Sequence, residues 1–351
     1  MSLDGHARWM ARAIALAERG RATCRPNPMV GCVLIRDGDL IGQGWHERPG
    51  GPHAEIAALN DAGDARGATA YVTLEPCNHH GRTGPCSVAL RDAGIDEVVY
   101  AAADSSAAAA GGADLLRDAG VRVVAGVLES WAAEQNVVFF HGIDDQRPHV
   151  TLKLAHTRGG ALVGAERWLT GPAARAAVHR LRRFVDGVLV GSGTVLADDP
   201  RLDVRHVELD GPGPRPIVLD SRGRIPPTSR VVRPGALVVT GDRSDPQWRQ
   251  ALVDAGAGVI VVEAHAAGLD LMQAMHELWS RGIHAILAEP GATLAASLLA
   301  AGHVDRLISH VADTTISDRY VLPAAVSAAA DWRLRRVVPR AGDLEVERRP
   351  A

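Results

Sequence analysis

The chain has few aromatic residues and no marked excess of charge of either sign. Only 7 Trp, 3 Phe and 3 Tyr occur in 351 residues, and the formal net charge is −3, from 38 basic and 41 acidic side chains. Nucleic-acid-binding surfaces are typically basic, and single strands are held by stacking on aromatic side chains. The composition therefore argues against a nucleic-acid partner.

Long apolar runs and a disulfide framework are lacking as well. No apolar run approaches the ~20 residues of a membrane span, so no membrane partner is expected. The apolar stretch Met10 to Ala17 is interrupted by Arg12 and recurs at helical spacing, which favours an amphipathic helix over an export signal. Four cysteines are too few for a disulfide scaffold and indicate thiols or metal ligands in a cytoplasmic protein.

The sequence does contain two successive alternations of strand and helix patterns. The first predicts strands at 29–36, 40–46, 70–74, 97–103 and 121–127 and helices at 54–62, 86–93, 114–119 and 128–140. The second predicts strands at 150–155, 187–190, 216–220, 236–240, 259–263, 284–288 and 306–311 and helices at 172–184, 246–254, 269–281 and 292–301. Such alternation is typical of an α/β fold with a parallel or mixed sheet.

A charged segment with Gly and Pro, His141–Pro148, lies between the two alternations. Its apolar residues do not recur at helix or strand spacing, so the segment is predicted to be a linker. A length of 351 residues suggests about two domains. We therefore expect domains at residues 1–145 and 146–351.

The strongest chemical signal is His53-Ala54-Glu55 followed by Cys77 and Cys86. One imidazole and two thiolates suit zinc, and three protein ligands leave a fourth position for water, as in catalytic sites. Glu55 lies close to the metal without needing to bind it, so it is predicted to carry protons between water and a leaving group. One Zn²⁺ per chain is expected.

This pattern matches the H-x-E and P-C-x-x-C signature of zinc deaminases, except that eight residues separate the cysteines instead of two. The alternative is a structural zinc site, which needs a fourth protein ligand. Residues that offer one are Cys24, Cys32, His46, His79 and His80. For Cys24 and Cys32, a role as small buried apolar side chains is the simpler interpretation.

Several longer motifs resemble one enzyme family. In the first half they are residues 26–31 (PNPMVG), 53–55 (HAE) and 73–86 (TLEPCNHHGRTGPC); in the second half they are Lys153 and residues 168–171 (WLTG), 190–200 (VGSGTVLADDP), 219–221 (LDS) and 289–294 (EPGATL). They resemble the bifunctional riboflavin-biosynthesis deaminase–reductases. The resemblance implies a cytidine-deaminase-like three-layer α/β/α domain followed by a dihydrofolate-reductase-like α/β domain.

The resemblance also implies the chemistry. The first domain would deaminate 2,5-diamino-6-ribosylamino-4(3H)-pyrimidinone 5′-phosphate with zinc, and the second would reduce the ribosyl group to a ribityl chain with NADPH. The partner would be this small-molecule substrate, and the chain would assemble as a homodimer or homotetramer.

Site residues carry over by position. In the first domain they are the zinc ligands His53, Cys77 and Cys86, the catalytic Glu55, and the substrate contacts Asn27, His46, His80, Arg82 and Asp104. In the second domain the NADPH contacts would be Ala155, Trp168, Thr194, Asp198, Ser221, Gly291, Ala292 and Thr293. The contacts to the reductase substrate would be Lys153, Arg182, Leu202, Arg205 and Glu289.

The chain departs from the family pattern at four places, one of which is residues 311–316 (VADTTI), where the family has Pro-x-Leu-Leu-Gly-Gly. Ser106 stands where the family has an Asn that helps to hold the ribose phosphate, Gly159 replaces an Asp, and Glu166 replaces a substrate-contacting Ser. These departures leave an alternative open, a deaminase whose second domain does not reduce or has changed specificity in a related pathway. A nucleic-acid base deaminase or a non-catalytic zinc-stabilised binding protein is the third class, disfavoured by charge and aromatic content.

Overall fold

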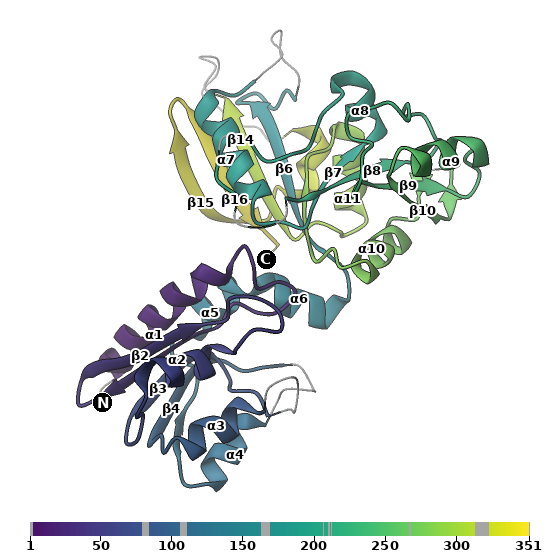
Figure 1. Cartoon of the computed structure of the whole chain (residues 1–351). Coiled ribbons are helices and arrows are strands. Elements are labelled where there is room, and N and C mark those ends of the chain that lie inside the picture. Colours follow the sequence, from purple (N-terminus) through teal and green to yellow (C-terminus); the bar gives the residue numbers. More distant parts are fainter. Residues whose placement is uncertain are drawn as a thin grey trace. The chain divides into compact units, whose positions relative to one another are not determined.

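The computed structural model describes residues 3–78, 84–105, 111–162, 169–205, 207–209, 211, 213–266, 268–312 and 323–350. The chain divides into two compact units, Met1–Asp145 and Gln146–Ala351. Each unit is an α/β domain with its own sheet (Figure 1). No helix within the described ranges is long and apolar enough to cross a membrane.

In its described part, the first unit has a five-stranded sheet in the order β2-β1-β3-β4-β5. The strands are β1 (Gly31–Arg36), β2 (Asp39–Trp45), β3 (Thr69–Leu74), β4 (Glu97–Ala102) and β5 (Arg122–Val124). Pairing is antiparallel from β2 to β3 and parallel from β3 to β5. The helices are α1 (Leu3–Ala17), α2 (Ala54–Ala62), α3 (Cys86–Asp92), α4 (Gly112–Asp118), α5 (Glu129–Gln135) and α6 (Val137–Asp145), with a 3₁₀ turn at Glu18–Gly20.

Helices cover both faces of this sheet, as expected for a three-layer domain (Figure 1). Two glycines let the helices approach closely. A Cβ on Gly31 would lie 2.1 Å from the carbonyl oxygen of Ala13 in α1, and a Cβ on Gly44 would lie 2.5 Å from the amide nitrogen of Ala58 in α2. Only glycine fits such approaches. Gly44 therefore fixes the helix that begins directly after His53.

The predicted linker at 141–148 is wrong for residues 141–145, because α6 continues to Asp145. The single helix expected at 128–140 is instead two helices that meet at Asn136. The Asn136 side chain accepts a hydrogen bond from the Met29 amide at 2.7 Å and donates one to the Met29 carbonyl at 2.8 Å. This long-range pairing holds Asn136 outside the helical conformation. The apolar pattern then resumes and runs through Ile143.

The described part of the second unit has a nine-stranded sheet in the order β10-β9-β8-β7-β13-β6-β14-β16-β15. The strands are β6 (His149–Thr157), β7 (Gly187–Gly191), β8 (Arg215–Asp220), β9 (Leu237–Gly241), β10 (Gly258–Val262), β13 (Ala285–Ala288), β14 (Arg306–Ala312), β15 (Arg333–Arg340) and β16 (Asp343–Arg349), besides a small ribbon of β11 (Ala264–His265) and β12 (Gly268–Leu269). Pairing is parallel from β10 to β14 and antiparallel beyond. The helices are α7 (Pro172–Arg182), α8 (Ser192–Asp198), α9 (Pro246–Asp254), α10 (Leu271–Ser280) and α11 (Ala292–Ala300), with a 3₁₀ segment at Ala324–Ala329.

Alternating strand residues fill two hydrophobic cores in this unit. Leu189 and Ile217 pack with α10 and α11, whereas Val188 and Val218 pack in the core that includes Leu252 of α9. Parallel strands that are buried on both faces form continuous apolar runs in the sequence, which explains why the seven parallel strands β6, β7, β8, β9, β10, β13 and β14 were predicted. It did not locate the short helix α8 or the C-terminal hairpin of β15 and β16.

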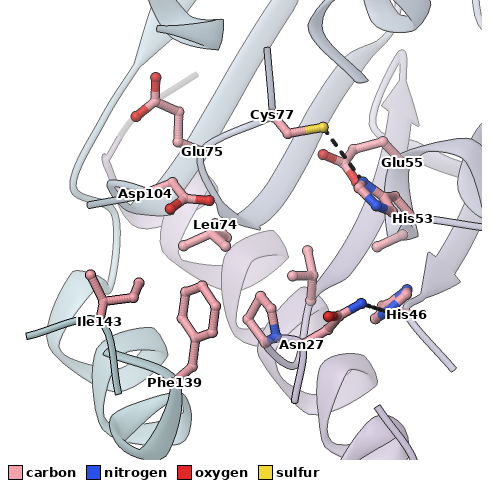
Figure 2. Close-up of a pocket in the computed structure, with 13 residues that line it drawn as sticks. Asn27, His46, His53, Glu55, Leu74, Glu75, Cys77, Asp104, Phe139 and Ile143 are labelled. Carbon is pink, nitrogen blue, oxygen red and sulfur yellow. Dashed lines mark hydrogen bonds between the residues drawn. The ribbon is translucent and has the colours of Figure 1, made fainter. Parts of the chain in front are cut away.

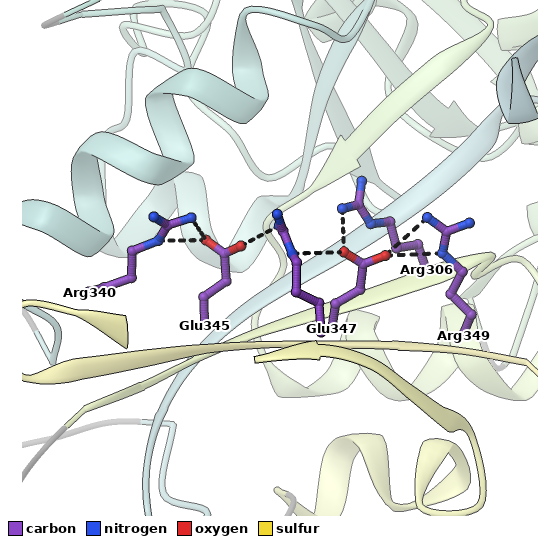
Figure 3. Close-up of polar contacts among 6 residues, drawn as sticks. Arg306, Arg340, Glu345, Glu347 and Arg349 are labelled. Carbon is purple, nitrogen blue, oxygen red and sulfur yellow. Dashed lines mark hydrogen bonds and ion pairs between the residues drawn. The ribbon is translucent and has the colours of Figure 1, made fainter. Parts of the chain in front are cut away.

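The C-terminal hairpin carries ion pairs in place of an apolar face. Figure 3 shows that the carboxylates of Glu345 and Glu347 lie between arginines from three strands. Arg336 and Arg340 contact Glu345 at 2.7 and 2.9 Å, and Arg306 contacts Glu347 at 2.6 Å. Because charges replace the apolar alternation that marks strands, the pattern predicts no strand here.

Candidate active sites

Three side chains with zinc-binding chemistry meet in the first unit. His53 directly precedes α2, Cys77 lies in the loop after β3, and Cys86 is the first residue of α3. His53 Nδ1 lies 3.5 Å from Cys77 Sγ and 3.2 Å from Cys86 Sγ. All three ligand atoms lie within 4.8 Å of one another. One imidazole and two thiols at this spacing fit a zinc ion with a fourth position open.

The environment favours the metal-binding form of one thiol. The hydrogen bond with Cys86 lowers the pKa of Cys77 to about 4, and the same pairing raises the pKa of Cys86. The hydrogen bond with Cys77 raises the pKa of His53. Since thiolates are the species that bind metals, the first proton leaves this pair of cysteines readily.

The described residues bring no fourth protein ligand to this cluster. Its members are His53, Cys77 and Cys86 alone. Cys24 and Cys32 are buried, and Cys24 Sγ hydrogen-bonds the Asn27 carbonyl at 3.4 Å. His46 lies 3.0 Å from both the Pro52 carbonyl and Asn27 Nδ2 through its two ring nitrogens, and His79 and His80 lie outside the described residues. Within the described ranges, the arrangement has the open position of a catalytic site.

Glu55 lies in the first turn of α2 and is only 3% exposed. Burial raises the pKa of its carboxyl group to about 7. A carboxyl group with such a pKa can both accept and release a proton near neutral pH. The positive charge of a nearby metal ion would favour the ionised form.

A cavity of about 250 Å³ opens beside the cluster (Figure 2). Its lining includes His53, Glu55 and Cys77 together with Asn27 and His46, and Asp104 also lines it. The structure thus brings together the described first-domain residues predicted to bind substrate. Arg82 and His80, predicted to bind the substrate as well, lie outside the described residues.

The amide of Asn27 has a defined orientation in this cavity. His46 Nδ1 lies 3.0 Å from the Pro52 carbonyl, so Nδ1 carries the proton and donates it. His46 Nε2 is then an acceptor, and it lies 3.0 Å from Asn27 Nδ2. Burial lowers the pKa of His46, which favours this neutral form. The Asn27 oxygen is therefore left to accept a hydrogen bond from a ligand (Figure 2).

The sequence interpretation missed two apolar residues of the cavity. Phe139 and Ile143 of α6 form part of its lining, across from His53 and Glu55 in Figure 2. Their spacing of four residues places both on one helix face. That spacing was the available signal, but Ile143 fell within the segment interpreted as a linker.

In the second unit, the predicted cofactor residues gather at one edge of the sheet. β7, β8 and β13 are parallel, and Thr194, Ser221 and Gly291 follow their carboxyl ends. Helix α11 begins at Ala292 after Gly291, without a side chain that caps its first amides. Free amides at a helix N-terminus suit the phosphates of a dinucleotide. Thr293 and Asp198 are exposed in the described structure, and Trp168 lies outside it.

Predicted contacts to the reductase substrate form a buried ion-pair group. Arg182 Nε lies 2.6 Å from Glu289 Oε1, and Lys153 Nζ lies 3.7 Å from Glu289 Oε2. Burial alone would raise the pKa of Glu289, but Arg182 and Lys153 hold it at about 2. Glu289 is therefore ionised at neutral pH, and its two cationic partners are held in fixed positions.

Leu202 and Arg205, also predicted to contact the reductase substrate, are not part of this ion-pair group. Leu202 is buried with a positive φ of 55°. Arg205 is exposed, and its Nε contacts Asp203 Oδ1 at 3.1 Å. Arg182 also donates to the Asp203 carbonyl at 2.9 Å, so one loop joins the two arginines. Glu166, the family departure, lies outside the described residues, and Gly159 follows β6.

Two family models match the two halves of the chain. Residues 4–102 match the cytidine and deoxycytidylate deaminase zinc-binding region, and residues 148–337 match the RibD C-terminal domain. The riboflavin biosynthesis protein RibD of Escherichia coli is 42% identical over 322 residues, which cover 87% of this chain and 86% of the relative. That of Aquifex aeolicus is 38% identical over 312 residues, 87% of this chain and 86% of the relative.

Solved structures agree over the full length. Acinetobacter baumannii RibD is 37% identical with a TM-score of 0.85, and all of each chain is covered. A diaminohydroxyphosphoribosylaminopyrimidine deaminase/5-amino-6-(5-phosphoribosylamino)uracil reductase from Thermotoga maritima is 30% identical with a TM-score of 0.84 over 99% of each chain.

This chain belongs to the RibD family. Membership confirms the resemblance found in the motifs and the expected fold class, a cytidine-deaminase-like domain followed by a dihydrofolate-reductase-like domain. A zinc-dependent deaminase domain explains the zinc-binding cluster of the first unit. An NADPH-dependent reductase domain explains the cofactor residues at the carboxyl ends of β7, β8 and β13 in the second. The family's reductase model begins at residue 148, just inside the second compact unit.

Proposed function

We propose that this chain carries out two consecutive steps of riboflavin biosynthesis, deamination in residues 1–145 and reduction in residues 146–351. The observation that carries the proposal is the convergence of His53, Cys77 and Cys86 beside the buried Glu55. The full-length similarity to RibD proteins supports the pairing of the two activities in one chain.

In the deaminase site, His53, Cys77 and Cys86 would hold Zn²⁺. A zinc ion bound there would lower the pKa of a water molecule, so that the water could attack at neutral pH. Glu55 would accept a proton from that water and pass it to the adjacent ring nitrogen. It would then take the proton of the new hydroxyl group and deliver it to the departing amino group, so that ammonia leaves as the carbonyl forms. Because Glu55 is buried beside the metal ligands, its carboxylate stays within reach of both the water and the amino group of the substrate.

The substrate is 2,5-diamino-6-ribosylamino-4(3H)-pyrimidinone 5′-phosphate. The Asn27 oxygen, fixed by His46, accepts a hydrogen bond from it, and Asp104 offers a second acceptor. Phe139 and Ile143 give the flat ring an apolar wall. His80 and Arg82 complete the assignment from the family pattern, with Arg82 suited to the phosphate.

In the reductase site, the edge formed by Thr194, Ser221 and the start of α11 would hold NADPH, with contacts from Ala155, Trp168, Asp198 and Gly291 to Thr293. NADPH supplies a hydride to the sugar carbon. Lys153, Arg182 and Glu289 orient the sugar and its phosphate, together with Leu202 and Arg205. The fixed Arg182–Glu289 pair keeps the orienting charges in place before the substrate arrives.

We further propose that the protein works in the cytoplasm as a homodimer or homotetramer. Free buried cysteines support a reducing compartment. The assembly rests on the family resemblance, and sedimentation of the purified chain would test it.

The experiment uses the purified full chain. We expect about one zinc per chain by elemental analysis, ammonia release from the diaminopyrimidinone substrate, and binding of NADPH in a calorimetric titration. NADPH oxidation with the deaminated intermediate then reports the second step. We expect the changes at Gly159 and Glu166 to slow this turnover more than they weaken NADPH binding, because only interactions stronger in the transition state speed the reaction.

The results separate the two halves of the proposal. Absence of zinc would contradict the deaminase site. Absence of NADPH binding at millimolar concentration would contradict the bifunctional assignment and leave a deaminase alone. Rapid NADPH oxidation would instead show that the residues at positions 159 and 166 do not limit the reduction.

A further inference from the structure

One buried histidine of the second unit has no role in the sites described so far. His310 of β14 has no exposed surface, and neither of its ring nitrogens has a hydrogen-bond partner within the described structure. Burying a polar group without a partner costs free energy, so such groups are rare. A ligand that completes these hydrogen bonds would remove that cost.

The register of the sheet places His310 among the predicted reductase contacts. His310 pairs with Ala155 of β6 and with Glu345 of β16. Lys153 lies two residues before Ala155, and side chains two apart on a strand share one face. The imidazole therefore lies on the same sheet face as Lys153, whose ammonium contacts Glu289.

The position along the strand also fits a ligand site. β6, β7, β13 and β14 are parallel, and His310 lies two residues before the carboxyl end of β14. In open α/β sheets, ligands bind at this edge of the strands. It is the same edge at which Gly291 and α11 follow β13.

The charge state decides what kind of group His310 can bind. Burial, reinforced by Lys153 of β6 and Arg340 of β15, lowers the pKa of His310 to about 4, although Glu345 and Asp343 of β16 oppose this. His310 is therefore neutral near pH 7, with one donor and one acceptor nitrogen. Such a ring suits a group that both donates and accepts, and it suits a phosphate poorly.

We propose that His310 is a substrate-binding residue of the reductase site, where its ring hydrogen-bonds an uncharged group of the deaminated substrate beside Lys153. Sugar hydroxyls and pyrimidine ring amides share the required chemistry, since each offers a donor and an acceptor. The proposal rests on the reductase function proposed above.

The test compares His310→Phe with Ser309→Ala. Phenylalanine keeps a ring of similar size and removes both hydrogen-bonding atoms. Ser309 is the matched control, because it is the adjacent buried residue, points to the opposite sheet face and also has no partner for its hydroxyl among the described residues. We expect His310→Phe to raise the KM for the deaminated substrate by about 10-fold or more, because a substrate group loses its partner.

Affinity for NADPH and the rate of deamination should stay within about twofold in both variants, and Ser309→Ala should leave the reductase KM unchanged. His310→Asn, which retains one donor and one acceptor, should recover part of the loss. A reductase KM and kcat for His310→Phe within about twofold of wild type would overturn the proposal. Should His310→Phe fail to fold, His310→Asn is judged against His310→Ala by the same criterion.

A wild-type chain without reductase activity can be distinguished from a wrong assignment of His310. If the wild-type chain binds NADPH but oxidises none, the deaminated substrate is titrated calorimetrically into the NADPH-loaded wild type and His310→Asn. Weaker binding by the variant supports the role of His310 without turnover. Equal binding, or none to either protein, overturns it.

Discussion

The two sites are assembled in opposite ways. In the first unit, His53, Cys77 and Cys86 bring three metal-ligating atoms within 4.8 Å of one another, and the described residues bring no fourth ligand to this cluster. In the second unit, Glu289 already has Arg182 and Lys153 as cationic partners. The first site is therefore an open set of metal ligands, whereas in the second the carboxylate already has its cationic partners before any ligand binds.

This difference determines whether a substitution in each site affects the activity alone or the stability as well. Removal of a group that moves protons in the first site affects the reaction and leaves the fold intact. Removal of a charge from the second site leaves buried partners uncompensated, so stability and activity change together. The predictions below test this distinction, in order of decreasing effect.

The largest effect is expected from Glu55→Gln, which keeps the shape of the side chain and removes the proton acceptor. Deamination should fall by roughly 10²–10⁴-fold, the usual contribution of a positioned acid or base. Zinc content and the melting temperature should stay unchanged, and so should NADPH oxidation, because Glu55 belongs to the other unit. Near-normal ammonia release would show that another group carries the protons.

A loss of stability is expected from Glu289→Gln. The pKa of Glu289 is about 2 in the folded chain and ordinarily 4.5, so its ionisation stabilises the fold above pH ~4.5, and this contribution disappears as the pH falls toward 2. The difference of roughly 2.5 pH units corresponds to about 3 kcal/mol at neutral pH. Urea unfolding of both proteins at pH 7, 5 and 3 measures it.

The difference in the free energy of unfolding between wild type and Glu289→Gln should become smaller toward pH 3. A difference that is independent of pH would contradict the ionic origin of the stabilisation. Reductase activity should fall in the variant at every pH, since Arg182 and Lys153 lose the carboxylate that holds them.

The same contrast explains what the sequence could predict. The zinc cluster is encoded by short local motifs, and residues 54–62 were predicted as the helix that the structure shows. Phe139 lay in the predicted helix 128–140 without being recognised as a cavity residue, and Ile143 was missed because the charged residues around it suggested a linker. The Arg182–Glu289 pair joins residues 107 apart in sequence, so only the strand order brings them together.

The C-terminal hairpin was missed for a related reason. Strands β15 and β16 carry arginines and glutamates where an apolar alternation would mark a strand. His310 was likewise inconspicuous, because its position beside Lys153 depends on the parallel pairing of β6 and β14. Local patterns therefore locate the chemistry of the first unit, and topology locates that of the second.

A moderate effect on both stability and zinc chemistry is expected from Gly44→Ala. The added methyl would lie 2.5 Å from the Ala58 nitrogen and 2.6 Å from the Ala54 oxygen, so α2 must move. Overpacking of this kind typically costs about 1–3 kcal/mol. Since α2 carries Glu55 and follows His53, deamination should fall as well.

Gly193→Ala is the control for this loss of stability, because its added methyl meets no atom within 4 Å. Its free energy of unfolding should equal that of wild type or exceed it, as alanine is favoured over glycine in a helix. Equal unfolding curves for Gly44→Ala and wild type would contradict the close approach of α2 to β2.

The smallest effect is expected from Arg336→Ala in the C-terminal hairpin. The Arg336 side chain is 50% exposed, and both of its partners keep other cations, Glu345 with Arg340 and Glu347 with Arg306 (Figure 3). Exposed ion pairs contribute at most about 1 kcal/mol, so the free energy of unfolding should change by less than that. Arg306→Ala is the matched variant. Its side chain is 23% exposed, and its loss should be the larger of the two. A reversed order would mean that exposure does not govern these pairs.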